Sequence, residues 1–168
     1  MITFKRYTVF PGQFLITSVP SLITTVLGSC VSVCLWDKHT GIAGLNHYLL
    51  PGSEKDVNGD PNLGYAATRM TIKSILNRNV ELHHLEAKIF GGSNSFSKDV
   101  DIFKVGKRNI DAAVEVLHEF GIPLIAQDVG GGRGRKIVFN TATGKVRMKL
   151  LTQSYIEANE TIHKGFGY

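Results

Sequence analysis

The chain alternates short apolar runs with polar turns, and this pattern predicts strands joined by hairpins. An apolar, β-branched run over 31–37 is followed by a polar turn at 38–41 and a second apolar run over 42–49. Polar turn residues between two such runs indicate a β-hairpin. Four more strands are expected on the same grounds, at 87–90, 123–129, 136–140 and 145–151, with a hairpin turn at 141–144.

Two helices are expected between the strands. Apolar residues recur at helical spacing over 62–78 and over 103–120, and Gly121 with Pro123 ends the second helix. Residues 1–23 are interpreted as extended segments around a Pro11–Gly12 turn. Because strands come in clusters separated by only two helices, the pattern favours an α+β fold with mostly antiparallel sheets over a doubly wound parallel sheet.

Length and composition bound the class of protein. With 168 residues, one domain over 1–168 is expected, and the polar residues 152–168 are expected to form a loosely held tail. No apolar stretch is long enough to insert into a bilayer, and the first residues lack a signal-peptide pattern, so we expect a cytoplasmic protein. Cys30 and Cys34 lie four residues apart in one strand, which is poor placement for a disulfide.

The net charge of +5 favours an acidic partner surface, although a solvated basic face explains the charge equally well. The most concentrated basic segment, Gly130–Lys136, is rich in glycine. It contains no Walker A pattern, and no RNA-binding aromatic pattern follows it. We therefore expect a tight cationic connection between two strands there, and no nucleic-acid partner.

The chemistry of the chain is concentrated where a Gly28–Ser29 turn delivers Cys30 to the first strand of the 31–49 hairpin. If that hairpin turns near His39, residues whose numbers add to about 78 face each other, and Cys30 and His47 lie within about one rung. A thiol beside an imidazole is a candidate nucleophile with its base. Backbone N–H groups of the turn would stabilise a thiolate and an oxyanion.

A third group usually orients the imidazole of such a pair, and three nearby residues can do so: Thr24, Thr25 and Asn46. Other interpretations of the cysteine and histidine remain open. Both can be core-packing residues, because free cysteine is often buried. Ser29 is an alternative nucleophile, although no G-x-S-x-G pattern surrounds it. A zinc site is a further alternative, because four residues have side chains that can bind zinc: Cys30, Cys34, His39 and His47. Their spacing matches no common zinc-binding pattern.

Several segments of the chain resemble the CheD family of chemoreceptor glutamine deamidases. The resemblance rests on five segments and covers most of the chain up to about residue 150: Thr24–Val33, Gly41–Pro51, Lys88–Gly92, Asp128–Gly131 with Gly134–Arg135, and Thr143–Gly144. It implies an α/β/β sandwich with two main helices, similar to the catalytic domain of cytotoxic necrotizing factor toxins.

The resemblance also implies an activity and a site. The activity is that of a protein-glutamine glutaminase, which hydrolyses glutamine side-chain amides to glutamate through a thioester, without metal or cofactor. The family's nucleophile falls on Cys30, its general base on His47 and its threonine on Thr24. The oxyanion is expected at Gly28 and Ser29 from the turn itself and not from the resemblance. Implied partners are the cytoplasmic helices of chemoreceptors, as substrate, and a CheC-type phosphatase. A non-catalytic docking module that binds either partner is the alternative. A methylesterase or transglutaminase side reaction of the thioester also stays open.

Overall fold

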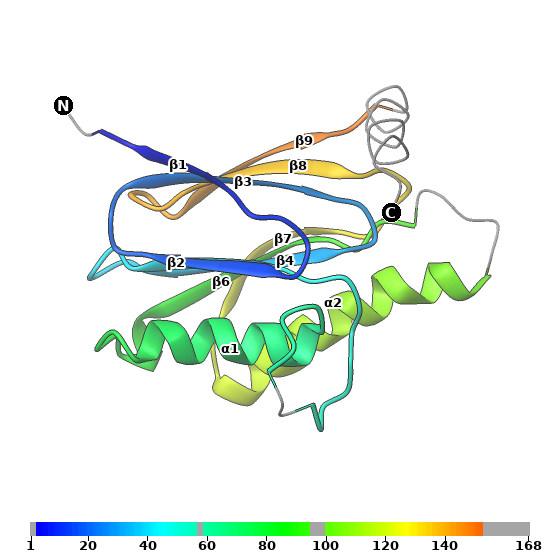
Figure 1. The fold of residues 1–168 in the computed structure, drawn as a ribbon, viewed down its shortest axis with the longest axis horizontal. Coiled ribbons are helices and arrows are strands. Elements are labelled where there is room, and N and C mark those ends of the chain that lie inside the picture. Colours follow the sequence, from blue (N-terminus) through cyan, green and yellow to red (C-terminus); the bar gives the residue numbers. More distant parts are fainter. Residues whose placement is uncertain (1–2, 57–58, 95–99, 153–168) are drawn as a thin grey trace, which may run out of the picture.

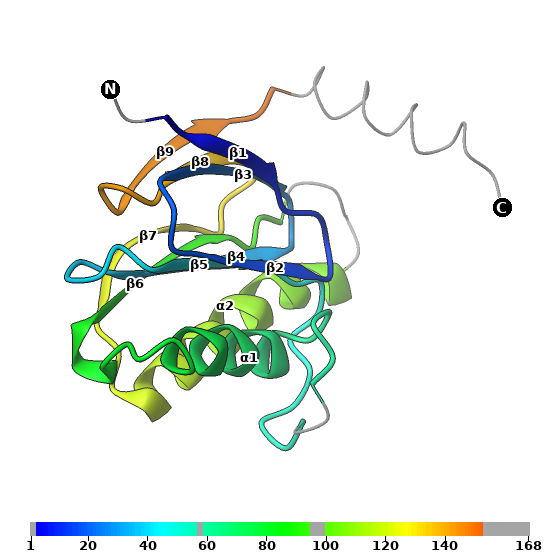
Figure 2. The same cartoon turned by 60° about the vertical axis from the view of Figure 1, so that its left-hand side comes forward.

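The computed structural model describes residues 3–56, 59–94 and 100–152, except for the side chains of residues 100–103. It consists of three layers: an outer sheet, a central sheet and a pair of helices (Figures 1 and 2). The outer sheet has the strand order β1 (Lys5–Thr8), β3 (Ser21–Leu27), β8 (Arg135–Asn140), β9 (Lys145–Leu150). The central sheet has the order β2 (Gln13–Thr17), β5 (Ala43–His47), β4 (Val31–Asp37), β6 (Leu85–Gly91), β7 (Leu124–Val129).

The helices cover only the face of the central sheet that points away from the outer sheet (Figure 2). They are α1 (Gly64–Leu76) and α2 (Val100–Phe120), and a short 3-10 helix, η1 (Leu82–His84), precedes β6. The predicted helices, strand pattern and both hairpins are confirmed, and so is the α+β class. Two pairings are parallel, β1 with β3 and β6 with β7, and the other five are antiparallel. The pair β6–β7 is parallel because α2 carries the chain back across the sheet.

The extended N-terminal segments divide between the two sheets. After β1 the chain turns at Pro11–Gly12 and enters β2 of the central sheet, and Gly12 adopts a φ of +77° at this corner. Strand β3 is absent from the sequence prediction. It forms because β1 and β8, distant along the chain, lie on either side of it.

Two apolar layers hold the molecule together. One lies between the helices and the central sheet, the other between the two sheets. Because side chains alternate along a strand, Val31, Val33 and Leu35 of β4 pack toward the helices. Cys30 and Cys34 pack toward the outer sheet. His47 is only 3% exposed, and it alternates with Ala43 and Leu45, which belong to the layer between the sheets. The predicted apolar face for this histidine is confirmed.

Three further expectations concern the C-terminal tail, the cysteines and membrane insertion. The tail prediction falls on residues of which only Thr152 is described, so it lies outside the described residues. Cys30 and Cys34 are both free thiols. Within the described ranges, no helix combines the length and the apolar character needed to cross a membrane.

Candidate active site

Cys30 lies in a three-residue connection that leads from β3 of the outer sheet to β4 of the central sheet, and it is half-buried. The carbonyl oxygens of this connection are all hydrogen-bonded. Gly28 O accepts from Ser93 N at 2.9 Å, and Cys30 O accepts from Gly92 N at 2.8 Å. Ser29 O accepts from the side-chain amide of Asn109 at 2.9 Å. These bonds fix the peptide orientations on which an oxyanion site depends.

The loops behind this connection are held by a buried guanidinium. Arg135 is 3% exposed and pairs with Asp128 at 2.7 Å. It also donates to Gly91 O at 3.2 Å and to Gly130 O at 2.8 Å. The glycine-rich basic segment is therefore a tight connection between β7 and β8, as expected, and its arginine joins the two sheets behind Cys30. Gly91 has a φ of +111°, and a Cβ there would overlap the carbonyl oxygen of Cys30.

Asn109 connects the cysteine end of β4 to the histidine end of β5. Its side chain is fully buried on α2, and its amide donates to both Ser29 O and Leu49 O at 2.9 Å. The hydroxyl of Tyr48 donates to the backbone oxygen of Asn109 at 2.5 Å. Sequence reasoning missed this residue, because it is one polar position in a helix far from the hairpin and nothing local marks it.

The imidazole of His47 is oriented by a threonine. Thr25 Oγ1 lies 2.8 Å from His47 Nδ1 and donates its proton to the carbonyl of Val9 at 2.7 Å. A hydroxyl has a single proton, so with that proton on Val9 the oxygen must accept from Nδ1–H. This network assigns the proton to Nδ1 and leaves the lone pair of the imidazole on Nε2.

The threonine that contacts the imidazole is Thr25, whereas the family resemblance implies this role for Thr24. Neighbouring residues of a strand face opposite sides, and Thr25 is 1% exposed between the sheets while Thr24 is half-buried on the far face of the outer sheet. Thr24 O accepts from Val9 N at 3.0 Å, which supports the β1 strand. Asn46, the third candidate, binds Thr71 of α1 and lies on the helix side of the central sheet.

The thiol and the imidazole share a face, and the hairpin register differs by one from the prediction. Cys34 pairs with Leu45 and Val31 with Tyr48, so residues whose numbers add to 79 are opposite each other. Extending this register by one residue makes Cys30 and His47 diagonal neighbours, about 7–8 Å apart between Cα atoms. The Nε2 atom of His47 is buried and has no hydrogen-bond partner among the described residues, the thiol included.

Ser32 lies directly opposite His47 in this register and is fully buried. Its hydroxyl also has no partner within the described part of the chain. Two opposite residues thus each have an unpaired polar atom in a mostly apolar layer, where an unpaired polar group is costly. This is the arrangement expected where a bound molecule supplies the missing hydrogen bonds. The alternation of Cys30 and Ser32 in the sequence was the signal that could have identified it.

Burial controls the charge state of the pair. Desolvation lowers the pKa of His47 to about 4, with the Val9 carbonyl partly opposing the shift. Desolvation also raises the pKa of the Cys30 thiol, partly offset by the residue's own backbone N–H. Near neutral pH both groups are therefore uncharged.

The four residues considered as zinc ligands do not converge. His39 stacks on His84 with ring centroids 4.0 Å apart, at the hairpin tip, whereas Cys30 lies beyond the other end of β4. A separate group of potential ligand atoms from Glu81, His83 and His84 lies within 4.8 Å near that tip. It is remote from the thiol.

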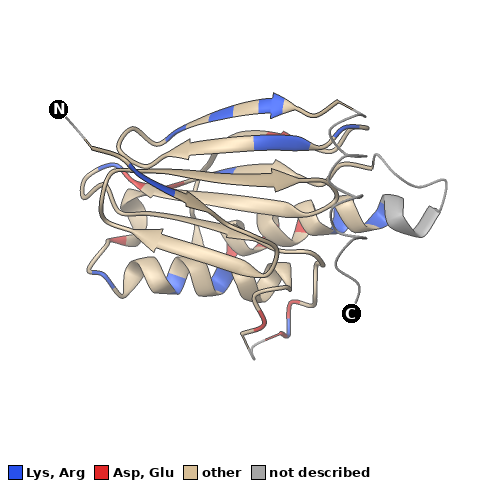
Figure 3. Ribbon diagram, turned by 45° about the horizontal axis from the view of Figure 1, so that its top comes forward, with Lys and Arg blue, Asp and Glu red and all other residues tan. Residues whose placement is uncertain are grey.

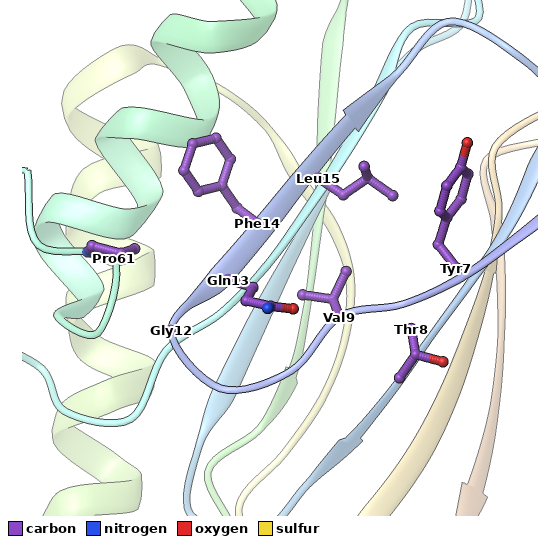
Figure 4. A pocket seen from close by; sticks show the side chains of 8 residues that line it. All are labelled: Tyr7, Thr8, Val9, Gly12, Gln13, Phe14, Leu15 and Pro61. Carbon is purple, nitrogen blue, oxygen red and sulfur yellow. The ribbon is translucent and has the colours of Figure 1, made fainter.

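A cleft of about 370 Å³ opens at the edge of the sandwich and is lined by residues of β1 and β2, which are the edge strands of the two sheets. Figure 4 shows Tyr7, Val9 and Leu15 around this opening between the sheets, with Phe14 on the other side of β2. Gln13 of the cleft is the register partner of His47. The cleft thus borders the histidine from the β2 side, and neither Cys30 nor His47 lines it.

Comparison with known proteins identifies relatives. A family model described as CheD chemotactic sensory transduction matches residues 49–150. The chain is 41% identical over 142 residues to the probable chemoreceptor glutamine deamidase CheD of Trichlorobacter lovleyi, over 84% of this chain and 88% of that protein. It is 38% identical over 152 residues to the one of Sulfurimonas denitrificans, over 89% of this chain and 96% of that protein.

Similarity to a solved structure is low. The crystal structure of the Bacillus licheniformis hypothetical protein YfiH aligns with a TM-score of 0.47 at 15% identity, over 68% of this chain and 49% of that chain.

Proposed function

The chain belongs to the CheD family of chemotactic sensory transduction proteins, and on that premise we propose that it hydrolyses glutamine side-chain amides of chemoreceptors to glutamate. In this proposal Cys30 is the nucleophile and His47 the general base. The observation that carries it is the free lone pair of Nε2. The Thr25 network leaves that lone pair unprotonated on the same face as the half-buried thiol.

Acylation begins from a neutral pair. His47 Nε2 removes the proton of the Cys30 thiol as sulfur attacks the carboxamide carbon, which avoids separating charge in the buried layer before substrate binds. Backbone N–H groups of the turn at Gly28 and Ser29 stabilise the oxyanion. The imidazolium then gives its proton to the departing nitrogen, and ammonia leaves a thioester on Cys30.

Hydrolysis of the thioester regenerates the thiol. A water molecule loses a proton to His47 Nε2 and attacks the acyl carbon, and the sulfur takes the proton back as glutamate leaves. In this proposal the hydroxyl of Ser32, which lies opposite His47 and has no hydrogen-bond partner among the described residues, binds this water or the carboxamide. Orientation of His47 is assigned to Thr25, and the role implied for Thr24 becomes a question for mutation.

Finer expectations from the family resemblance belong to the same proposal. They are the similarity of the sandwich to the catalytic domain of cytotoxic necrotizing factor toxins, binding of a CheC-type phosphatase, and action in the cytoplasm on receptor helices. In the proposed deamidase the acyl group of the thioester is transferred to water, whereas in a transglutaminase it is transferred to an amine.

Mass spectrometry of a chemoreceptor cytoplasmic fragment tests the function. The wild-type chain is expected to convert specific glutamines to glutamates and release ammonia, and Cys30→Ala to do neither. Cys34→Ala is the matched control, because Cys34 is 1% exposed in the layer between the sheets and should leave the conversion intact. Conversion by Cys30→Ala would refute the nucleophile. Binding without conversion by the wild type would indicate the docking module instead.

A further inference from the structure

The charges of this protein are divided unevenly between its layers. The four strands of the outer sheet contain seven of the nineteen Lys and Arg residues and none of the fourteen Asp and Glu residues. The rest of the chain therefore carries twelve basic against fourteen acidic residues, a net charge of −2. The overall charge of +5 arises in the outer sheet. Figure 3 shows its strands marked in blue, with the acidic positions in the other layers.

The register places five of these cations on one face. Strand alternation directs Ile23, Ile137 and Phe139 toward the central sheet, so their neighbours point outward. We call this surface the basic face, and its cations are Arg6, Lys136, Lys145, Arg147 and Lys149. None of the five forms an ion pair with a described residue. In the described part of the chain, neither helix packs against the outer sheet.

The arrangement is unfavourable for the isolated protein. Lys136 and Lys149 are direct cross-strand partners. Like charges in such positions destabilise a sheet. Neighbouring strands are about 4.8 Å apart, and successive residues on one face of a strand about 7 Å, both shorter than the Debye length of about 8 Å at physiological salt. Each of the four cations on β8 and β9 therefore lies within the range of repulsion of another. An acidic partner laid on this face would remove the repulsion and gain attraction.

The middle of the basic face is less polar than its border. On the two middle strands, Val26 is 39% exposed, and Leu22 and Val138 are half-buried. An apolar centre with a charged border is the composition of a protein-binding surface. No aromatic side chain lies among the outward positions of the described strands, so the stacking that single-stranded nucleic acid requires is not provided.

From these observations we infer that the basic face is a docking surface for an acidic protein. Resting on the proposed function, we assign the acidic helical surface that carries the substrate glutamines as its occupant. The proposed reaction itself converts neutral glutamine to glutamate, so the partner gains negative charge with each turnover. The face thus acts as a second contact outside the active site, which concentrates the substrate protein near Cys30.

Binding of the receptor cytoplasmic fragment in the Cys30→Ala background measures docking without turnover. Reversing two charges of the face, in Arg147→Glu/Lys149→Glu, is expected to weaken binding about tenfold or more and to flatten its salt dependence. The matched control Lys73→Glu/Arg78→Glu makes the same change in net charge at exposed positions by the end of α1, and should have a much smaller effect. With Cys30 present, the face variant should deamidate a short neutral glutamine peptide as fast as the wild type.

Each outcome decides one question. Equal weakening by both double variants, or by neither, would refute a localised docking face. Loss of binding to anionic vesicles or to DNA, with receptor binding unchanged, would reassign the face to a membrane or a nucleic acid. If the wild type deamidates the fragment and the face variant binds it normally, only the docking inference fails. If nothing is deamidated while the face variant alone loses binding, only the catalytic proposal fails.

Discussion

The tautomer and the orientation of the His47 imidazole depend on where the hydroxyl proton of one threonine lies. Thr25 donates that proton to the carbonyl of Val9, so its oxygen can only accept a hydrogen bond from His47 Nδ1. Nε2 is then unprotonated before substrate arrives, and burial keeps it so by lowering the pKa of His47 to about 4. A single threonine on a neighbouring sheet thereby does what a carboxylate does in many hydrolases, without placing a charge between the sheets.

Single replacements of the two adjacent threonines show which of them orients His47 and which only packs in its strand. Thr25→Val should lower kcat by about tenfold or more with little change in KM, because the imidazole loses the contact that selects its tautomer. Thr25→Ser should restore most of the activity. Thr24→Val, on the opposite face of the same strand, should stay close to wild type in steady-state kinetics on the receptor fragment. The reverse ranking would favour the threonine implied by the family resemblance.

At the scale of elements, the connection between β3 and β4 is built by contacts with segments that follow much later in the chain. The segment after β6 donates two backbone N–H groups to it, and α2 donates a side-chain amide. Arg135 at the start of β8 holds the same segment from behind. The connection that contains Cys30, the proposed nucleophile, therefore cannot shift without breaking several hydrogen bonds.

Two glycines with positive φ test this support. Gly91→Ala should destabilise the fold by about 3 kcal/mol or more and abolish activity, because its Cβ would overlap the Cys30 carbonyl oxygen. Gly121→Ala, at the end of α2, has φ +66° and open space around it, and should cost about 1 kcal/mol with activity retained. Urea denaturation and deamidation rates check both. Equal costs would mean that backbone strain, not the contact with Cys30, limits position 91.

At the scale of the whole molecule, the layer between the two sheets makes the stability of the fold depend on the charge of one side chain. It is mostly apolar, and it contains His47, whose buried imidazole resists protonation on mild acidification. Its pKa in the fold lies below the ordinary value, so the unfolded chain binds the proton more readily between about pH 6.5 and pH 4. The contribution of the neutral imidazole to stability is complete above that window and is lost as the pH falls through it.

Chemical denaturation of the wild type and of His47→Gln at pH 7 and at pH 4.5 checks this linkage. The wild type should lose about 2–3 kcal/mol more than the variant between the two pH values. The comparison cancels the titration of carboxylates that both proteins share. Parallel loss in both would mean that the imidazole is solvated in the folded protein.

Local pattern determined the elements and the candidate residues. The hairpin that contains Cys30 and His47, the helices and the paired strands β8 and β9 follow from periodicity and turn composition, which act over a few residues. The shared face of the thiol and the imidazole did not follow, because it depends on the register: a slip of one residue moves one of the two side chains to the other face of the sheet. Strand β3 and the facing of Thr25 did not follow, since β3 is defined by pairing with β1 and β8.

The sequence by itself thus determined which groups can react, and only the tertiary structure decided how they are held. The observed register, which differs by one from the predicted register, makes Cys30 and His47 diagonal neighbours on one face and places Ser32 opposite the imidazole. Charge state was also decided by the fold, because desolvation depends on which layers close over a residue. Both effects come from contacts between segments far apart in the chain, which no local pattern records.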